Sequence, residues 1–321
     1  MNRYLITGAT GYIGSMLIKK LSEDNASHIT ALVRDSYKAS QTLPNTTEIF
    51  EADITDTNAL NVLKERYFDY IIHCASPTQS AYMISHPSMT SMTIIEGTRN
   101  ILDIAKHCNP ISFVFLSSME VYGNIDCSDG HRVTEDETGH IDSCNPRSCY
   151  PLGKLTAEEL CRSYFKDYGI PVKIARLAQT FGQGVLPDDT RVFMQFANAA
   201  MSGNDIVLHT AGNSMGNYCE INDALQGILT ILHKGNNGEA YNVVNESNTM
   251  RIREMAELVA SELAHNRIDV IYDIPEDNPY GYAADTGLRL SSAKLMSLGW
   301  RPTRSLKEMY QDIIVERGTK L

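Results

Sequence analysis

Short apolar runs alternate with amphipathic segments along residues 1–180 and again along 222–244. The apolar runs predict buried strands at 3–7, 29–33, 48–54, 70–76, 113–118, 171–182 and 239–244. Amphipathic spacing predicts helices between them, at 15–24, 58–67 and about 92–107, with another that begins near Tyr150. Strands that alternate with helices and lack polar alternation indicate an α/β protein, with a parallel sheet covered on both faces.

The pattern loosens after residue 178. Helices are expected at 192–203, 222–234, 252–264 and 305–317, short strands at 205–210 and 268–273, and a Pro/Gly/Tyr-rich loop over 275–287. We therefore predict a nucleotide-binding domain over 1–178, to which 222–245 returns. A smaller C-terminal α/β substrate-binding lobe would comprise 179–221 and 246–321.

Composition narrows the function. The chain has 321 residues, 43% of them hydrophobic, a net charge of -11 and a pI near 5.3. This acidity argues against nucleic-acid or membrane-surface binding, which needs positive patches. The sequence shows no signal peptide and no apolar stretch long enough to span a bilayer, so a cytoplasmic protein is expected. Seven scattered cysteines without a CxxC pair predict free thiols and no metal site.

The segment GATGYIG at 8–14 follows the first strand and opens the first helix. Gly8 permits a tight turn, Gly11 lets the backbone approach a pyrophosphate, and Gly14 allows close packing of helix on sheet. The helix N-terminus then binds the phosphates. These features predict a Rossmann-type, doubly wound sheet that binds a dinucleotide. The remaining contacts are expected from the glycine turn and from residues after strands, namely Thr10, Tyr12, Ile13, Ile54, Cys74, Ala75, Ser76 and Ser117.

The end of the second predicted strand bears on the choice between NAD and NADP. Arg34 would suit a 2′-phosphate, which slightly favours NADP, whereas Asp35 could still bind the ribose hydroxyls of NAD. Asp53, after the third strand, would either meet the adenine amino group or cap the following helix.

Tyr150 and Lys154 share one helical face at i, i+4 spacing. A free phenol has a pKa of about 10, so a tyrosine base needs a cation beside it. Ser118, at the carboxyl end of a strand, could bond the same substrate hydroxyl. This set predicts proton transfer to and from an alcohol.

The chain resembles the extended short-chain dehydrogenases/reductases of the nucleotide-sugar epimerase/dehydratase family. The resemblance covers essentially the whole length, through GATGYIG, ADITD, HCAS, EGTRNIL, FVFLSSMEVYG, YPLGK, RLAQTFG, EAYNVV and LGWRP. It implies tightly bound NAD or NADP that takes hydride from C4 of a nucleotide-activated sugar. Tyr150 would be the base, Lys154 would hold the nicotinamide ribose, and Ser118 would orient the sugar. It also implies a homodimer paired through the helices near 92–107 and 150–168.

The same resemblance makes Glu120 the acid/base at sugar C5 after C4 oxidation, which favours epimerisation or dehydration over simple inversion at C4. Met119 stands where some dehydratases have a second acid. Decarboxylation of a nucleotide sugar is an alternative. A net NADP-dependent reductase or dehydrogenase of a carbonyl or alcohol, and a cofactor-binding regulator without catalysis, are further alternatives.

Several positions depart from the family pattern. Ile94 and Gln179 replace asparagines, and Gly216 replaces an arginine that binds the nucleotide diphosphate in relatives. The diphosphate would then be met by Arg191, Arg251 or Arg289, or the leaving group differs. Substrate contacts are expected from Ser118, Met119, Gln179, Arg191 and Arg289, and Asp223 is expected to cap its helix.

Overall fold

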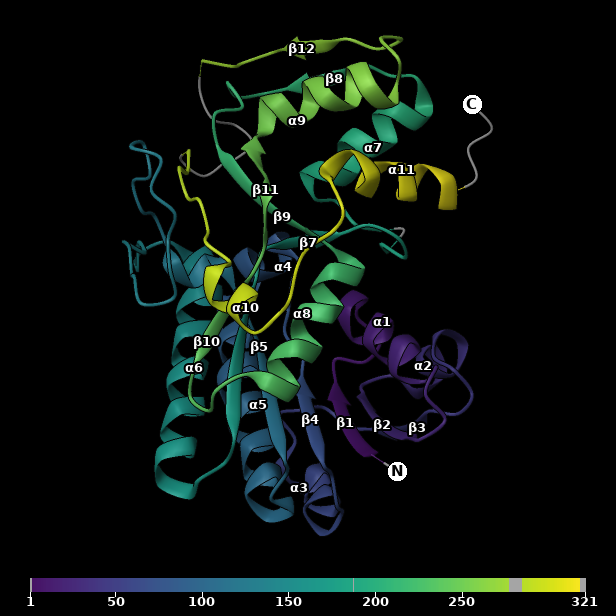
Figure 1. The fold of residues 1–321 in the computed structure, drawn as a ribbon, viewed down its shortest axis with the longest axis vertical. Helices are drawn as coiled ribbons and strands as arrows, with labels where there is room; N and C mark the ends of the chain where they lie inside the picture. Colours follow the sequence, from purple (N-terminus) through teal and green to yellow (C-terminus); the bar gives the residue numbers. More distant parts are fainter. Residues whose placement is uncertain (1, 187, 277–284, 318–321) are drawn as a thin grey trace.

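The computed structural model describes residues 2–186, 188–276 and 285–317. Its centre is a parallel sheet of seven strands in the order β10-β6-β5-β4-β1-β2-β3 (Figure 1). The strands are β1 (Asn2–Thr7), β2 (Ser27–Val33), β3 (Glu48–Glu51), β4 (Tyr70–His73), β5 (Ser112–Ser118), β6 (Val172–Leu177) and β10 (Ala240–Val243). This confirms the predicted α/β fold with a Rossmann-type, doubly wound sheet.

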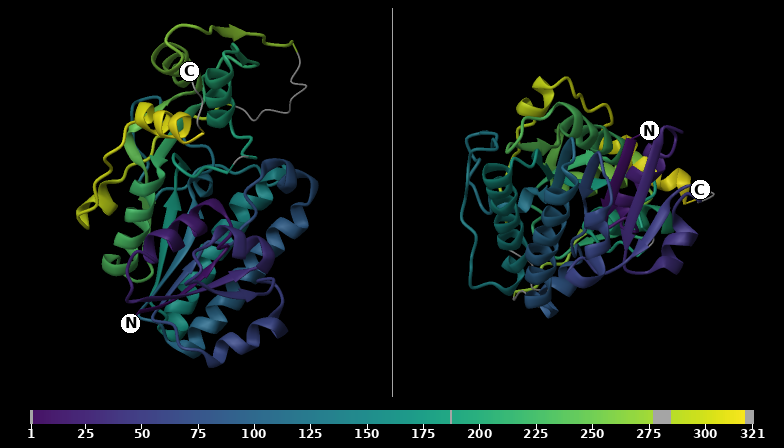
Figure 2. Two further views of the ribbon diagram at one scale, coloured as in Figure 1. Left: turned by 90° about the vertical axis from the view of Figure 1, so that its right-hand side faces the viewer. Right: turned by 90° about the horizontal axis from the view of Figure 1, so that it is seen from below.

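Helices cover both faces of this sheet (Figure 2). On one face, α1 (Tyr12–Leu21) and α8 (Ile221–Lys234) bury apolar residues such as Leu17 and Ile228 against Ile6 and Val114. On the other, α5 (Pro87–Cys108) and α6 (Cys149–Tyr168) pack against β4 and β5. The remaining helices beside the sheet are short: α2 (Ser36–Thr42), α3 (Thr57–Leu60), α4 (Ser80–Ser85) and α10 (Ala293–Ser297). Burial on both faces explains why the strands are apolar throughout.

The strand order reverses at β1, which pairs with β2 on one side and β4 on the other. Open α/β sheets bind ligands in the crevice at such a point, beyond the carboxyl ends of the strands. The glycine turn follows β1, and Ser118 ends β5, at this same edge. The fold therefore gathers the predicted cofactor and catalytic residues.

A smaller lobe lies beyond the carboxyl ends of the strands (Figure 1). Two small sheets form it: β11-β9-β7 and β12-β8. Phe181 stacks on Phe193 with ring centres 4.2 Å apart, and Tyr310 meets Phe181 edge-on. The elements are β7 (Gln179–Phe181), α7 (Val192–Ser202), β8 (Ile206–Leu208), β9 (Met215–Glu220), β11 (Asn245–Arg251), α9 (Ile252–Leu258), a π turn (Val259–Leu263), β12 (Val270–Tyr272) and α11 (Leu306–Glu316).

Several element boundaries differ from the sequence prediction. The strand expected over 171–182 is two strands, β6 and β7, because the chain leaves the large sheet at Ala178 and joins β9 instead. The helix expected at 58–67 is a single α turn, α3, that continues as a 3-10 helix over Asn61–Glu65, and α4 was not expected. Of the loop expected over 275–287, residues 277–284 lie outside the described residues.

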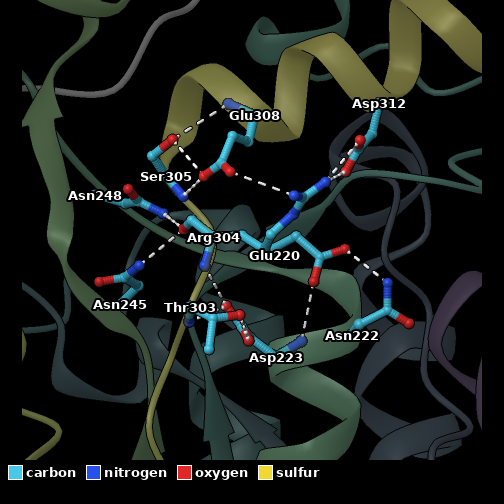
Figure 3. Close-up of polar contacts among 10 residues, drawn as sticks. All are labelled: Glu220, Asn222, Asp223, Asn245, Asn248, Thr303, Arg304, Ser305, Glu308 and Asp312. Atoms are coloured by element: carbon cyan, nitrogen blue, oxygen red, sulfur yellow. Dashed lines mark hydrogen bonds and ion pairs between the residues drawn. The ribbon is translucent and has the colours of Figure 1, made fainter.

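The sequence suggested that Asp223 caps its helix, but the structure shows another role for it. Glu220 is the N-cap of α8, and its carboxylate accepts from the Asp223 backbone N–H. The Asp223 carboxylate instead accepts from the backbone N–H groups of Thr303 and Arg304, at 2.8 and 3.0 Å (Figure 3). It thereby holds the segment 301–305, which leads into α11 and is called the strap below.

The same strap is held by the smaller lobe. Asn245 and Asn248 at β11 both donate to the carbonyl oxygen of Arg304, and the Arg304 side chain pairs with Asp312 (Figure 3). Leu295 and Trp300, before the strap, pack into the core beneath the large sheet. Residues 293–300 thus contact the nucleotide-binding part, although the sequence assigned all of 246–321 to the smaller lobe.

Candidate active site

The glycine turn has the geometry of a dinucleotide cradle. Gly8 has φ +62°, and a Cβ there would lie 2.8 Å from backbone atoms of Ala75, so only glycine fits. Gly11 is the N-cap of α1 without a side-chain cap, and the first turn has no acid. The N–H groups of this turn are thus available to an anion. With these N–H groups uncapped and no acid beside them, the residues present suit a pyrophosphate.

The residues around this turn lie where the sequence placed them. Thr10 precedes α1, and Tyr12 and Ile13 begin it. The Tyr12 hydroxyl donates to the Gln183 carbonyl, and burial raises the pKa of Tyr12. Cys74, Ala75 and Ser76 directly follow β4, and backbone atoms of Cys74 and Ala75 lie close to Gly8.

The residues predicted to meet the adenosine lie at the ends of β2 and β3. Arg34 is exposed after β2 and has no ion pair within the described part of the chain. Asp35 caps α2 by accepting from the Lys38 N–H at 2.8 Å. Asp53 accepts from Thr55, and although burial raises the pKa of its carboxyl, the Thr55 hydrogen bonds and Arg34 outweigh that effect and lower it. Asp56, rather than Asp53, caps the next helix.

His73, which sequence reasoning did not single out, ties three elements together. Its Nδ1 and Nε2 lie 2.7 and 3.1 Å from the hydroxyl oxygens of Thr7 and Thr98. Burial, with Lys154 adding to it, lowers the pKa of His73 to about 3, so the ring is neutral. The motif HCAS carried the signal, since a histidine at the end of an apolar strand needs polar partners.

Tyr150 and Lys154 are both buried on the first turns of α6. The Lys154 nitrogen lies 5.8 Å from the centre of the Tyr150 ring and donates to the Leu116 carbonyl at 2.7 Å. Burial lowers the pKa of Lys154 to about 8. Burial and the Glu120 charge raise the pKa of Tyr150, whereas the Ser118 hydroxyl and the charges of Arg147 and Arg191 lower it.

Glu120 follows Ser118 in a short 3-10 helix, Met119–Tyr122. Its carboxylate pairs with Arg147, with Oε1 2.9 Å from Nη2. Both residues line a cavity of about 250 Å³ together with Met119, Pro151, Thr286 and Leu288. This cavity joins the end of β5 to the smaller lobe, so a ligand there meets both Glu120 and the start of α6.

Arg147 is the main residue that the sequence reading missed. It precedes Tyr150 by three residues, in the segment PRSCYPLGK, and this spacing puts the two side chains on one face. The guanidinium carbon lies 5.4 Å from the centre of the Tyr150 ring. That spacing was the available signal.

The expected substrate residues of the smaller lobe are only partly gathered. The charge of Arg191 lowers the pKa of Tyr150, but its guanidinium is paired with Asp189, with Nη2 2.5 Å from Oδ2. Gln179 begins β7, and Arg289 adjoins Leu288 of the cavity, whereas Arg251 pairs with Glu254. Gly216 cannot carry a side chain in this structure, because a Cβ would collide with the Tyr218 ring.

The described residues contain no group of histidines, cysteines or acids that could hold a metal ion, and all seven cysteines are free thiols. Within the same residues, no helix is both long and apolar enough to cross a membrane.

Comparisons with known proteins agree with this fold. UDP-glucuronic acid decarboxylase 3 of Arabidopsis thaliana is 30% identical over 314 residues, 95% of this chain and 86% of the relative. UDP-glucuronic acid decarboxylase 1 of Danio rerio is 29% identical over 313 residues, 95% of this chain and 70% of the relative. The UDP-glucose 4-epimerase of Thermotoga maritima, solved with UDP-glucose, has the same fold, with a TM-score of 0.84, 21% identity and 98% of each chain covered.

A model of the NAD dependent epimerase/dehydratase family matches residues 4–245, which include nearly all of the large sheet and also the glycine turn, Ser118, Glu120, Tyr150 and Lys154. The chain therefore belongs to the NAD dependent epimerase/dehydratase family.

Proposed function

We propose that this protein oxidises C4 of a nucleotide-activated sugar to a 4-keto intermediate, on which Glu120 then acts as acid/base at C5 to give epimerisation or dehydration. The observation that carries the proposal is the meeting of Ser118, Tyr150, Lys154 and Glu120 at the carboxyl end of β5. When bound, NAD or NADP supplies the hydride acceptor. The glycine turn at Gly8, Gly11 and Gly14, together with Ala75, is the place where this cofactor would bind.

Tyr150 removes the proton of the C4 hydroxyl in this proposal. A buried phenol stays protonated unless cations stabilise its phenolate, and Lys154, 5.8 Å from the ring centre, provides one. The Ser118 hydroxyl lowers the pKa of Tyr150, which supports a sugar hydroxyl bound by both oxygens. Lys154 also holds the nicotinamide ribose.

Glu120 acts once C4 is a ketone, because the C5–H bond next to a carbonyl is acidified. The Glu120 carboxylate lines the cavity beside the start of α6, within reach of the carbon next to C4. Removal of the C5 proton by Glu120 and delivery of another proton to the opposite face would epimerise the sugar. Departure of the C6 hydroxyl as water, with the proton that Glu120 took from C5, would dehydrate it.

Decarboxylation is a second candidate, favoured by the two UDP-glucuronic acid decarboxylases that align over 95% of this chain. A 4-keto uronate loses CO₂ from C5, and the resulting enolate needs a proton, which Glu120 in its acid form would supply. Net reduction of a carbonyl substrate, or net oxidation of an alcohol, would need no such group.

NADP is preferred over NAD in this proposal. Arg34 is exposed and unpaired within the described residues, so it can meet a 2′-phosphate. The Asp35 carboxylate, which could bind the ribose of NAD, is already occupied by the Lys38 N–H. Charge-assisted bonds of arginine to phosphate are the stronger kind.

The sugar diphosphate is met by Arg191 or Arg289, and the sugar by Ser118, Met119 and Gln179. Gly216 offers no side chain, and Arg251 is turned to Glu254. Arg191 acts electrostatically on both Tyr12 and Tyr150, which supports a place beside the cofactor and the sugar. Asp189 would have to share its arginine with the substrate.

A homodimer is also proposed. Met89 and Met92 on α5 and Leu152 on α6 are 52%, 49% and 37% exposed, which leaves apolar surface on the helices that pair in such dimers. Light scattering would give twice the chain mass if this is right. A cytoplasmic location is proposed with it, on the seven free thiols.

One experiment tests the main proposal. The protein, loaded with NAD or NADP, is incubated with UDP-glucuronic acid, UDP-glucose or dTDP-glucose in deuterated water. A rise in the near-ultraviolet absorbance of reduced nicotinamide reports C4 oxidation, and mass spectrometry reports deuterium at C5. The parent should show both with at least one sugar, and Tyr150→Phe should show neither. No absorbance change with any of the three sugars would reject the proposed function.

A further inference from the structure

Arg147 contacts both chemical groups of the candidate site. Nη2 lies 2.9 Å from Oε1 of Glu120, and the guanidinium carbon lies over the Tyr150 ring, 5.4 Å from its centre. Nε donates to the hydroxyl of Ser80 on α4 at 3.3 Å. A single side chain therefore joins the base proposed for C5 to the base proposed for C4.

Its backbone is fixed by local hydrogen bonds. The Asn145 side chain caps the short 3-10 helix Pro146–Ser148 by accepting from the Arg147 N–H at 2.9 Å. The Ser148 hydroxyl donates to the Asp142 carbonyl at 2.6 Å. Because Pro146 presets the backbone at the first position, the turn is rigid before α6 begins. The guanidinium is thus held from a firm base.

One donor of Arg147 is left over. Nη1 is buried and has no hydrogen-bond partner among the described residues. A buried donor without a partner costs about 1–3 kcal/mol, so an unpaired donor beside a cavity calls for an explanation. This spare donor is consistent with a role toward a ligand in the cavity that Arg147 lines.

We propose that Arg147 is a positioning residue for the C5 step: it holds the Glu120 carboxylate at the cavity wall and offsets its charge beside Tyr150. The inference rests on the proposed function and adds a division of labour to it. Glu120 raises the pKa of Tyr150, whereas Arg147 lowers it. Without Arg147 an unpaired carboxylate would both swing freely and oppose formation of the Tyr150 phenolate.

The step itself is balanced without a further reactant. The C5–H bond breaks, its electron pair moves toward the C4 carbonyl as an enolate, and the proton goes to Glu120. The ion pair with Arg147 then becomes a hydrogen bond between a guanidinium and a neutral carboxylic acid. Return of the proton to C5 restores the pair.

The test separates the two partial reactions with a matched control. Arg147→Met, Glu120→Gln and the double variant are compared with Arg66→Met, all as full-length protein loaded with cofactor. Arg66 is a suitable control because it pairs with Glu48 at 2.6 Å and lies over the Phe50 ring, the same kind of arrangement away from the site. The probe is the sugar that gives the parent both signals among UDP-glucuronic acid, UDP-glucose and dTDP-glucose.

Arg147→Met should slow deuterium entry at C5 by ~100-fold, as loss of a working acid/base does, while C4 oxidation falls by no more than ~10-fold. The double variant should be no slower at C5 than Glu120→Gln alone, because both changes disable one unit. Arg66→Met should match the parent in both signals. A further variant, Arg147→Ala, leaves room for a free guanidinium ion. Guanidinium added well below its denaturing concentration should restore part of the C5 exchange to this variant.

Three outcomes would overturn the inference: C5 exchange at the parent's rate in Arg147→Met, additive losses in the double variant, or equal loss of both signals with no rescue by guanidinium. Circular dichroism confirms that each variant is folded before the rates are compared. If the parent itself oxidises no sugar, the proposed function fails first, and that result is distinct from a failure confined to Arg147.

Discussion

Ser117 and Ser118 are adjacent at the end of β5, yet their hydroxyl groups have different partners. Ser117 donates to the buried carboxylate of Glu158 at 2.6 Å, whereas Ser118 accepts from the Glu120 N–H and lowers the pKa of Tyr150. The hydroxyl proton of Ser117, a residue predicted to contact the cofactor, is thus used within the fold.

Alanine at these two serines should separate stability from activity. Ser117→Ala should lower the free energy of unfolding by about 1–2 kcal/mol, because Glu158 loses one of its donors, and should leave kcat within ~3-fold. Ser118→Ala should leave stability nearly unchanged and lower kcat by ~100-fold. Urea denaturation and steady-state kinetics on the same preparations measure both. Equal kinetic effects would contradict the assignment of the two side chains.

Lys154→Met should stabilise the protein while abolishing turnover. The pKa of Lys154 is about 8 in the fold, and burial causes the shift from about 10.4 in an unfolded chain. A lysine with a lowered pKa costs stability below pH 8, and that cost fades as pH rises toward 10.4. The free energy of unfolding of the variant should therefore rise by on the order of 2 kcal/mol at pH 7, reduced by whatever the lost hydrogen bond to the Leu116 carbonyl contributes. The gain should be smaller at pH 10. Denaturant unfolding at both pH values checks the sign.

Glu158 should make the fold sensitive to acid. It is fully buried and accepts two bonds from Arg176, at 2.9 and 2.7 Å. Burial alone would raise the pKa of Glu158, but Arg176, Ser117 and Arg162 outweigh it and lower the pKa. A lowered pKa stabilises the fold above the unfolded value of about 4.3, and this contribution disappears as pH falls through the folded pKa.

Glu158→Gln should consequently cost about 3–5 kcal/mol at pH 7, since it leaves the Arg176 charge buried without its partner. The difference from the parent should shrink as pH falls below about 4. Unfolding free energies across this pH range measure it. A constant difference at every pH would exclude the ion pair as its source.

Arg34→Ala should weaken NADP binding by ~10-fold or more and NAD binding by less than ~3-fold, because only NADP carries the phosphate that the guanidinium would meet. Titration calorimetry with each cofactor gives the two dissociation constants. Arg3→Ala, an arginine at the opposite end of the sheet, is the control. Equal losses for both cofactors would refute the preference for NADP.

Gly216→Arg should not provide an arginine for the substrate diphosphate. The Tyr218 ring occupies the space that a side chain at 216 would need, so the substitution should cost about 1–3 kcal/mol through overpacking. Thermal unfolding should show the loss, and substrate affinity should not improve. Tighter substrate binding in this variant would mean that Tyr218 moves aside readily.

Much of the fold followed from the sequence because strand, glycine turn and helix are local patterns. Tyr150 and Lys154 came from spacing within one helix, and Ser118 from a strand end. Two predictions failed, the extent of β6 and the cap of α8, because they depend on more than local pattern. Whether residues 179–181 extend β6 or join β9 depends on partners far along the chain, and a continuous apolar run contains no such information. Glu220, two residues before the expected start of α8, became its cap because helix ends vary by a residue or two.

Arg147 was missed for another reason. Its role depends on Glu120, 27 residues earlier in the chain, and only the fold brings the two side chains together. The sequence supplied half of the signal, the i, i+3 spacing from Arg147 to Tyr150. The other half required the position of the 3-10 helix after β5, which no local pattern specifies.

The strap at Thr303 and Arg304 has a consequence for how the molecule unfolds. Asp223 on α8, beside the large sheet, accepts from the Thr303 N–H. Asn248 in the smaller lobe donates to the Arg304 carbonyl and accepts from the Leu306 N–H. Neither lobe can melt without releasing polar groups that the other still holds. The two lobes should therefore lose structure in one cooperative transition, with a single heat-absorption peak, despite being built around separate cores.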